Sequence, residues 1–230
     1  KSFPFSLVFS RFLPQGRCLS GGSIHNKPRG KSRKEVMGKG RLEAFSDGVL
    51  AIIITIMVLE MKVPHGDSLS ALRPLLPVFL SYVLSFVYLG IYWNNHHHML
   101  HVTQHVSGAV LWANLHLLFW LALVPFVTAW MGENHFSAAP TALYGVVLLM
   151  AAIAYWILQR TIISREGPHS LLAAAVGSDI KGKISPLLYA IAIPSAFFEQ
   201  WIAGGLYVLV ALLWLIPDRR IERKLGEPKP

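Results

Sequence analysis

A single acidic residue stands at the start of a long apolar stretch. Asp47 ends the segment Arg-Leu-Glu-Ala-Phe-Ser-Asp over residues 41–47, and an apolar stretch follows over residues 48–61. An aspartate inside a membrane helix costs about 2.5–3.5 kcal/mol, so such a residue carries a function or anchors the structure through a partner. The neighbouring Ser46 adds a hydroxyl that can bridge polar groups. We therefore expect hydrogen-bond donors close to Asp47.

The partners expected for Asp47 lie on two later segments. One reads Tyr-Trp-Asn-Asn-His-His-His over residues 92–98, and the other follows at residues 114–116. The expected membrane topology brings a set of polar residues to the same leaflet: Asp47, Asn94, His96, Asn114 and His116. Unpaired polar groups in hydrocarbon are costly, so this set predicts a hydrogen-bond cluster that fixes the first helix to the second and third. The alternative is that these residues contact water at the membrane interface.

Three histidines have a helical spacing that suits a metal ion. His97, His101 and His105 fall at i, i+4 and i+8, and such a row can bind zinc. Because neither a carboxylate nor a cysteine is near them in sequence, a polar helix end is favoured over a metal or pH-sensing site. The chain also lacks phosphate-loop, zinc-protease, serine-hydrolase and Thr-Val-Gly-Tyr-Gly filter motifs. We expect no enzyme activity, no cofactor and no metal; an enzyme with a histidine-rich metal site is the least favoured class.

The composition is that of a membrane protein. Of 230 residues, 53% are hydrophobic and only 14% are charged, and the mean hydropathy is +0.48; a soluble domain has about 25% charged residues. The net charge of +9 comes from Lys and Arg between and beyond the apolar runs. That placement favours contact with lipid head groups and excludes a nucleic-acid partner. The only cysteine, Cys18, excludes an internal disulfide.

The chain divides into three parts. Residues 1–36 have a single acidic residue, at position 35, and are rich in Ser, Arg, Gly and Pro, which indicates a disordered leader or transit peptide, or an over-extended reading frame before a true start at Met37. The over-extended reading frame is the favoured interpretation. Residues 37–217 form the expected six-helix transmembrane domain, and residues 218–230 form a basic cytoplasmic tail.

Six apolar stretches are long enough for membrane helices, although the last two are slightly short. The expected spans are 42–62, 72–99, 108–131, 138–162, 184–199 and 201–217. Basic residues gather before span one, between spans four and five, and after span six, which places all three segments in the cytoplasm. We therefore expect an all-α protein of the cell membrane with both termini cytoplasmic.

The first span is apolar on every face after Asp47, so hydrophobic periodicity does not select a buried side. Ile52, Ile56 and Leu59 form one stripe of bulky residues, with Thr55 beside it. Taken alone, that stripe is typical of core packing.

The pattern Arg41-x-x-x-Phe45-Ser46-Asp47, followed by an Ile-rich helix, resembles the transmembrane protein 175 family, the endolysosomal potassium channels of animals and their prokaryotic relatives. Trp93-x-x-His96 and Pro125-Phe126-x-Thr128 add weaker support. The resemblance covers about residues 41–217. Animal members carry two six-helix repeats, and this chain has one, so it is similar to the prokaryotic form.

The resemblance implies a homotetrameric potassium channel without a carbonyl filter, in which the first helix of each subunit lines the pore. Ile52, Ile56 and Leu59 would form hydrophobic constrictions, which gate by dewetting, and Thr55 would form a polar ring. A set of residues would hold this helix against its neighbours: Arg41, Phe45, Ser46, Asp47, Trp93, His96 and Asn114. The alternative function is a proton- or cation-coupled secondary transporter that uses Asp47 and His96 as a relay.

Overall fold

The computed structural model describes residues 32–176 and 180–215. Most of the expected leader and all of the expected tail at 218–230 lie outside these ranges. Within them, every regular element is an α-helix or a short 3₁₀ helix: α1 (Ser32–Ile56), η1 (Met57–Glu60), η2 (Leu69–Leu75), α2 (Leu76–Val102), α3 (Gly108–Ala122), α4 (Val124–Glu133), α5 (Ala138–Glu166), α6 (Leu171–Val176), α7 (Ile180–Phe198) and α8 (Gln200–Leu215). The expectation of an all-α protein is confirmed for the described residues. Helix α1 begins at Ser32, which places the end of the expected leader in a helix.

Four segments of the described chain are long and apolar enough to cross a membrane. They are Gly38–Glu60, Leu69–Val102, Gly108–Glu133 and Ala138–Glu166, and they agree with the first four expected spans. Helix α8 is a shorter apolar helix, and α7 carries two lysines in its first turn. The expected number of six membrane spans therefore stays a prediction.

Two expected spans are interrupted. Helix α3 ends at Ala122 and α4 begins at Val124, because Pro125 has no N–H for the hydrogen bond that would continue the helix. The first span changes from α to 3₁₀ geometry after Ile56. Beyond it, the Lys62 ammonium donates to the Glu133 carboxylate at 2.9 Å, and this hydrogen bond raises the pKa of Lys62. The pair is exposed to solvent and is therefore weak.

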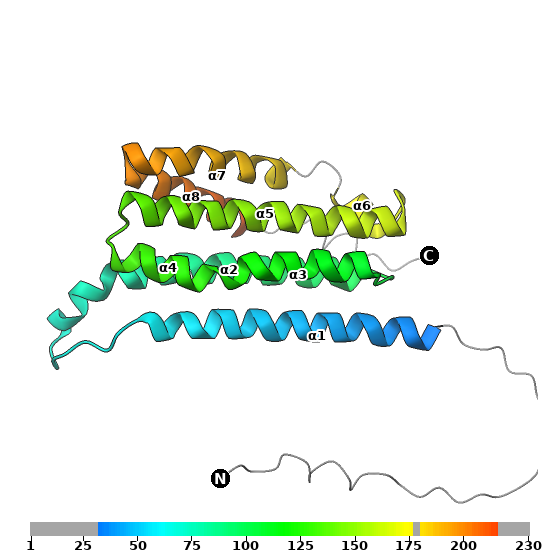
Figure 1. Ribbon diagram of the computed structural model, residues 1–230, viewed down its shortest axis with the longest axis horizontal. Coiled ribbons are helices and arrows are strands. Elements are labelled where there is room, and N and C mark those ends of the chain that lie inside the picture. The colour runs from blue at the N-terminus through cyan, green and yellow to red at the C-terminus, as the bar shows by residue number, and fades with distance from the viewer. Residues whose placement is uncertain (1–31, 177–179, 216–230) are drawn as a thin grey trace, which may run out of the picture. The chain divides into compact units, whose positions relative to one another are not determined.

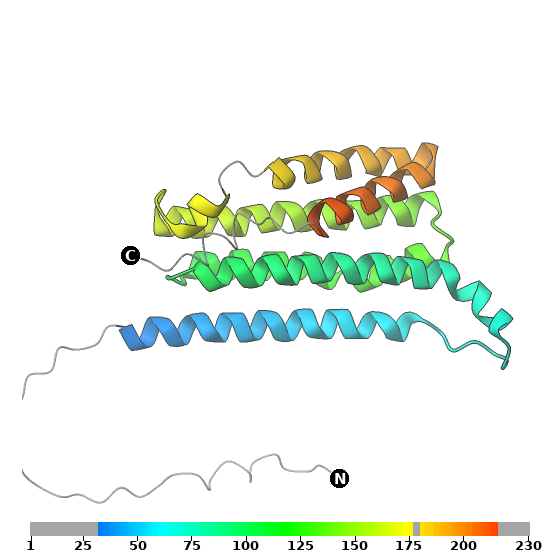
Figure 2. The same ribbon diagram turned by 180° about the vertical axis from the view of Figure 1, so that it is seen from behind.

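The helices of residues 32–215 pack side by side, with α5 in the middle of the contacts (Figure 1). Helix α5 packs against α3, α4 and α7, while α2 packs along α4. Seen from behind, α8 lies against α7, α5 and α2 (Figure 2). Helix α1 contacts α2, α3 and α4 along one side, and its other sides face away from these helices.

Helices α2 and α4 approach closely at Gly132. A Cβ added there would lie 2.7 Å from the backbone Cα of Val78 and 2.5 Å from the hydroxyl oxygen of Ser81. Backbone atoms cannot rotate away, so the substitution Gly132→Ala forces the two helices apart. Overpacking of this kind costs about 1–3 kcal/mol. We expect Gly132→Ala to lower the thermal unfolding midpoint of the purified protein in detergent.

The matched control is Gly205→Ala in α8, where an added Cβ meets no atom within 4 Å. Alanine is favoured over glycine in a helix by about 1 kcal/mol, so this variant should keep or raise the midpoint. Equal midpoints for the two variants would contradict the close approach of α2 and α4.

Candidate functional site

Helix α1 has one buried stripe. Ile53 is only 4% exposed, and the other members of the stripe are also buried: Leu42, Ser46, Leu50 and Met57. Their spacing of three and four residues is that of one helix face. This stripe packs on α2, α3 and α4. It fixes the rotation of α1, which the uniformly apolar sequence left open.

The opposite face of α1 is apolar and uncovered. Ile52 is 61% exposed and Leu59 is 78% exposed, and Ile56 lies between them on the same face. Thr55 is exposed as well, and its hydroxyl donates to the Ala51 carbonyl of its own helix at 2.9 Å. Within one chain, this face presents branched apolar side chains and one hydroxyl to whatever lies outside.

A buried chain of hydrogen bonds joins α1, α3 and α2. The Asn114 amide donates to the Ser46 hydroxyl at 2.9 Å, and Ser46 donates to the Leu42 carbonyl at 2.9 Å. The Asn114 carbonyl oxygen lies 2.7 Å from Nε2 of His96. Since a carbonyl oxygen only accepts, Nε2 carries the proton. All three side chains are buried, and the chain satisfies each of them.

Asp47 is held from α2 by a different residue. The Trp93 indole N–H donates to its carboxylate at 3.1 Å. Among the described residues, no histidine bonds to Asp47, so the donor is an indole, one of the N–H groups expected near this carboxylate. Trp93 in turn stacks on His97, with ring centroids 6.0 Å apart. Arg41 and Phe45 lie on the exposed part of α1.

The N-terminal part of α1 is also tied to the C-terminal end of α2. The Lys39 ammonium donates to the backbone carbonyl of His101 at 2.6 Å and lies 3.8 Å from the Glu43 carboxylate. Carbonyls in the last turn of a helix have no partner within it, and a cation there is favourable. Lys39 thus caps α2 from α1.

Two members of the expected cluster do not join it. Asn94 is exposed on α2. His116 is half-buried and accepts a hydrogen bond from the Trp120 indole of its own helix at 3.0 Å. The helix face at Asn114 points to Ser46, and a residue two positions later lies on another face of α3.

The expected row of three histidines is also interrupted. His97 and His101 stack on α2 with centroids 6.2 Å apart, but α2 ends at Val102, so His105 lies in the following loop. In the described part of the chain, no group of three or more His, Cys, Asp or Glu side chains is arranged to hold a metal ion.

Comparison with known proteins places this arrangement in a family. The family described as the endosomal/lysosomal potassium channel TMEM175 matches residues 41–125. The potassium channel HX13_20290 of Chryseobacterium sp. (strain P1-3) is 59% identical over 191 residues, which cover 83% of this chain and 100% of that protein. The chain belongs to the TMEM175 family.

Two further comparisons agree. The potassium channel B446_29190 of Streptomyces collinus (strain DSM 40733 / Tue 365) is 34% identical over 187 residues, covering 76% of this chain and 90% of that one. The crystal structure of a lysosomal potassium-selective channel TMEM175 homolog from Chamaesiphon minutus superposes with a TM-score of 0.69 at 29% identity, covering 80% of this chain and 98% of that one. The resemblance to prokaryotic members is thereby confirmed, and the chain is a multi-pass membrane protein.

This TMEM175 family member also contains a polar cluster that the sequence reasoning missed. The Ser85 hydroxyl lies 2.6 Å from the Thr128 hydroxyl and 3.0 Å from that of Tyr144, which joins α2, α4 and α5. Tyr207 of α8 donates to the carbonyl of Thr141 at 3.0 Å. The available signal was the presence of hydroxyl residues inside apolar spans, where polar groups need partners.

Proposed function

We propose that this chain is the subunit of a potassium-permeable channel. The observation that carries the proposal is the uncovered face of α1 with Ile52, Ile56 and Leu59, opposite a face that is packed and hydrogen-bonded to the same subunit. Support comes from the relatives, which are named as potassium channels. Because the family consists of ion channels, the expectation that the chain is not an enzyme is confirmed.

In this proposal four chains assemble as a homotetramer, and each contributes its α1 to a central pore. Ile52, Ile56 and Leu59 then form rings of branched side chains, and Thr55 forms a ring of hydroxyls between them. Narrow apolar rings exclude water when they close, so they gate without a filter of backbone carbonyls. Each subunit crosses the membrane six times, with α7 and α8 as the last two spans.

The anchoring residues keep the pore helix in register with its own subunit. Ser46, His96 and Asn114 do so through the buried hydrogen bonds, and Asp47 does so through Trp93. Arg41 and Phe45 lie on the exposed side of the same segment, where a neighbouring subunit would contact them. Both termini are cytoplasmic, the membrane is the cell membrane, and the lipid bilayer is the surrounding solvent.

The alternative, a transporter with an Asp47–His96 relay, is less well supported. His96 bonds to Asn114 and Asp47 bonds to Trp93. A relay needs the two groups within hydrogen-bond reach or bridged by water. The potassium-channel relatives also favour a channel over the carrier.

The test is single-channel recording from purified protein in a planar bilayer. Unitary current steps in potassium chloride, with a reversal potential that shifts toward the potassium equilibrium value when sodium replaces potassium on one side, are expected. Flux that saturates, needs a counter-ion and gives no unitary steps would overturn the channel in favour of the carrier. Native mass spectrometry of the same sample checks the tetramer.

A further inference from the structure

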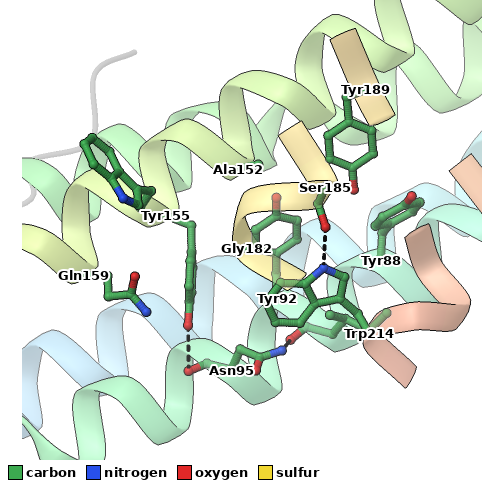
Figure 3. Close-up of a pocket in the computed structure, with 12 residues that line it drawn as sticks. Tyr88, Tyr92, Asn95, Ala152, Tyr155, Gln159, Gly182, Ser185, Tyr189 and Trp214 are labelled. Atoms are coloured by element: carbon green, nitrogen blue, oxygen red, sulfur yellow. Dashed lines mark hydrogen bonds between the residues drawn. The ribbon is translucent and has the colours of Figure 1, made fainter. Parts of the chain in front are cut away.

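A pocket lies on the side of α2 that faces away from α1. Helices α2, α5, α7 and α8 surround it, and it holds about 570 Å³ of space including its open mouth. Figure 3 shows its walls, which come from all four helices. The residues that form the proposed pore do not line it, so the pocket is separate from the channel site.

The walls of the pocket are mostly aromatic and are held in place. The rings of Tyr92 and Tyr155 meet edge to face at 6.2 Å, and Tyr88 lies 6.4 Å from Tyr189. The Trp214 indole is oriented by a 2.8 Å hydrogen bond to the Ser185 hydroxyl. Aromatic faces and edges favour stacked or edge-to-face contact with another ring. A flat ring fits such walls better than a branched molecule does.

One polar side chain that lines the pocket makes no hydrogen bond to the residues that the structure describes. Gln159 of α5 is 7% exposed and lines the pocket, and the described residues make no hydrogen bond to its amide. None of the fully buried side-chain N or O atoms of the described residues lacks a partner, so the Gln159 amide keeps some access to the pocket, near the end of the fourth expected span and next to Arg160. Its donors and its acceptor are open to the pocket.

Two neighbouring groups are also available to a guest molecule. Asn95 uses its amide nitrogen for the carbonyl of Ile91 at 2.8 Å, which leaves its side-chain oxygen as an acceptor. The Tyr92 hydroxyl makes no hydrogen bond to the described residues and can donate or accept. All three residues line the pocket, and Figure 3 shows Gln159 on one side of the Tyr155 ring and Asn95 and Tyr92 on the other. The pocket thus offers donors and acceptors beside aromatic walls.

The pocket is uncharged. Its lining includes neither an acidic nor a Lys, Arg or His side chain. Arg160 is nearby, but its guanidinium lies over the ring of Trp156 at 5.7 Å and is not part of the lining. A charged guest would lose its hydration without gaining a counter-charge. The uncharged lining therefore favours a neutral molecule.

From these features we propose that the pocket is a binding site for a small, uncharged, ring-containing molecule with at least one hydrogen-bond donor and one acceptor, such as an aromatic amide or a phenol. The ring lies between the aromatic walls, and its polar groups bond to Gln159, Asn95 and Tyr92. The exposed indole of Trp156 marks the mouth of the pocket.

The test uses 4-hydroxybenzamide as the probe and isothermal titration calorimetry on the purified full-length protein in detergent. Saturable binding with one site per chain is expected, beyond the heat of partition into empty micelles. Gln159→Leu should weaken it at least tenfold, because the leucine keeps the volume and removes the hydrogen bonds. Ala152→Phe should abolish it by filling the pocket, since Ala152 lines it. The matched control Gln104→Leu, in the exposed loop after α2, should bind as the wild type does.

Several outcomes would overturn the proposal. Equal affinity of the wild type and Gln159→Leu is one, and heat that matches partition into empty micelles is another. Equally tight binding of the anion 4-hydroxybenzoate would contradict the choice of a neutral guest. A lipid that native mass spectrometry finds bound to the purified wild type and not to Ala152→Phe would identify the occupant as a lipid. Thermal midpoints of the variants show that they remain folded. Because the readout is binding and not flux, failure of the channel assignment leaves this test unaffected.

Discussion

Replacement of Ile52 by asparagine is expected to raise potassium flux through proteoliposomes by about tenfold or more. In the proposed tetramer, four Ile52 side chains form an apolar ring that water leaves when the pore closes. An amide at each position hydrogen-bonds water and lowers the barrier, and about 1.4 kcal/mol off a barrier already gives about a tenfold rate. Flux is measured as potassium-driven quenching of a proton-sensitive dye inside the vesicles, with single-channel currents as the second readout.

The adjacent residue supplies the matched control. Ile53 is buried against the same subunit, so Ile53→Asn removes core packing and buries an amide, at a cost of roughly 2–5 kcal/mol. This variant should lose thermal stability without a gain in flux, whereas Ile52→Asn should keep its unfolding midpoint. Unchanged flux for Ile52→Asn, or an equal loss of stability in both variants, would contradict the proposal that α1 lines the pore.

The substitution Asn114→Leu is expected to lower stability more than the replacement of any other polar side chain in α3 by leucine. It leaves Nε2 of His96 without an acceptor and takes one donor from the Ser46 hydroxyl. Each buried polar group left without its partner costs about 1–3 kcal/mol. The thermal midpoint in detergent should therefore fall by several degrees, and α1 should become more accessible to limited proteolysis.

Asn94→Leu makes the same chemical change on an exposed part of α2. Because Asn94 stands outside the hydrogen-bond chain, its variant should keep the wild-type midpoint. If Asn94→Leu and Asn114→Leu were equally mild, the buried chain would contribute nothing measurable to the attachment of α1.

The sequence predicts the helical spans well and their faces poorly. The first four spans follow from long apolar runs between polar turns, and the structure has a helix at each. The buried side of α1 did not follow, because residues 48–59 are almost all apolar and only the neighbours decide which of them is covered. Ile53 and Ile52 differ in burial and not in chemistry.

The three consecutive histidines at residues 96–98 also take their different environments from the neighbouring helices. Residues 96, 97 and 98 point in directions about 100° apart on a helix. Only the position of α3 selects His96, which is buried, while His97 is exposed. The phase of buried residues earlier in α2, at Ser85 and Leu89, supports position 96, yet it becomes visible only once those residues are known to be buried.

The pocket shows where the sequence carried a signal that was not used. Gln159 is a polar residue near the end of the fourth expected span, next to Arg160, and polar residues inside such spans generally have a partner or a function. The same rule that drew attention to Asp47 applies to it. Its aromatic neighbours come from helices distant in sequence, so their convergence could not be predicted without the fold.

The attachment of α1 is unequal along its length, and this has a mechanical consequence. Among the described residues, the hydrogen bonds between α1 and other helices involve Lys39 as a donor, and Ser46 and Asp47 as acceptors. Beyond them, the described contacts of α1 and η1 with other helices are apolar and have no preferred direction, and the next polar contact is the weak, exposed Lys62–Glu133 pair after η1. A rigid helix that is bonded at one end is displaced most at its other end when it tilts. Since Leu59 is more than twice as far from Asp47 as Ile52 is, tilting α1 about its bonded end would, in the proposed tetramer, widen the ring at Leu59 more than the ring at Ile52, without breaking a buried hydrogen bond.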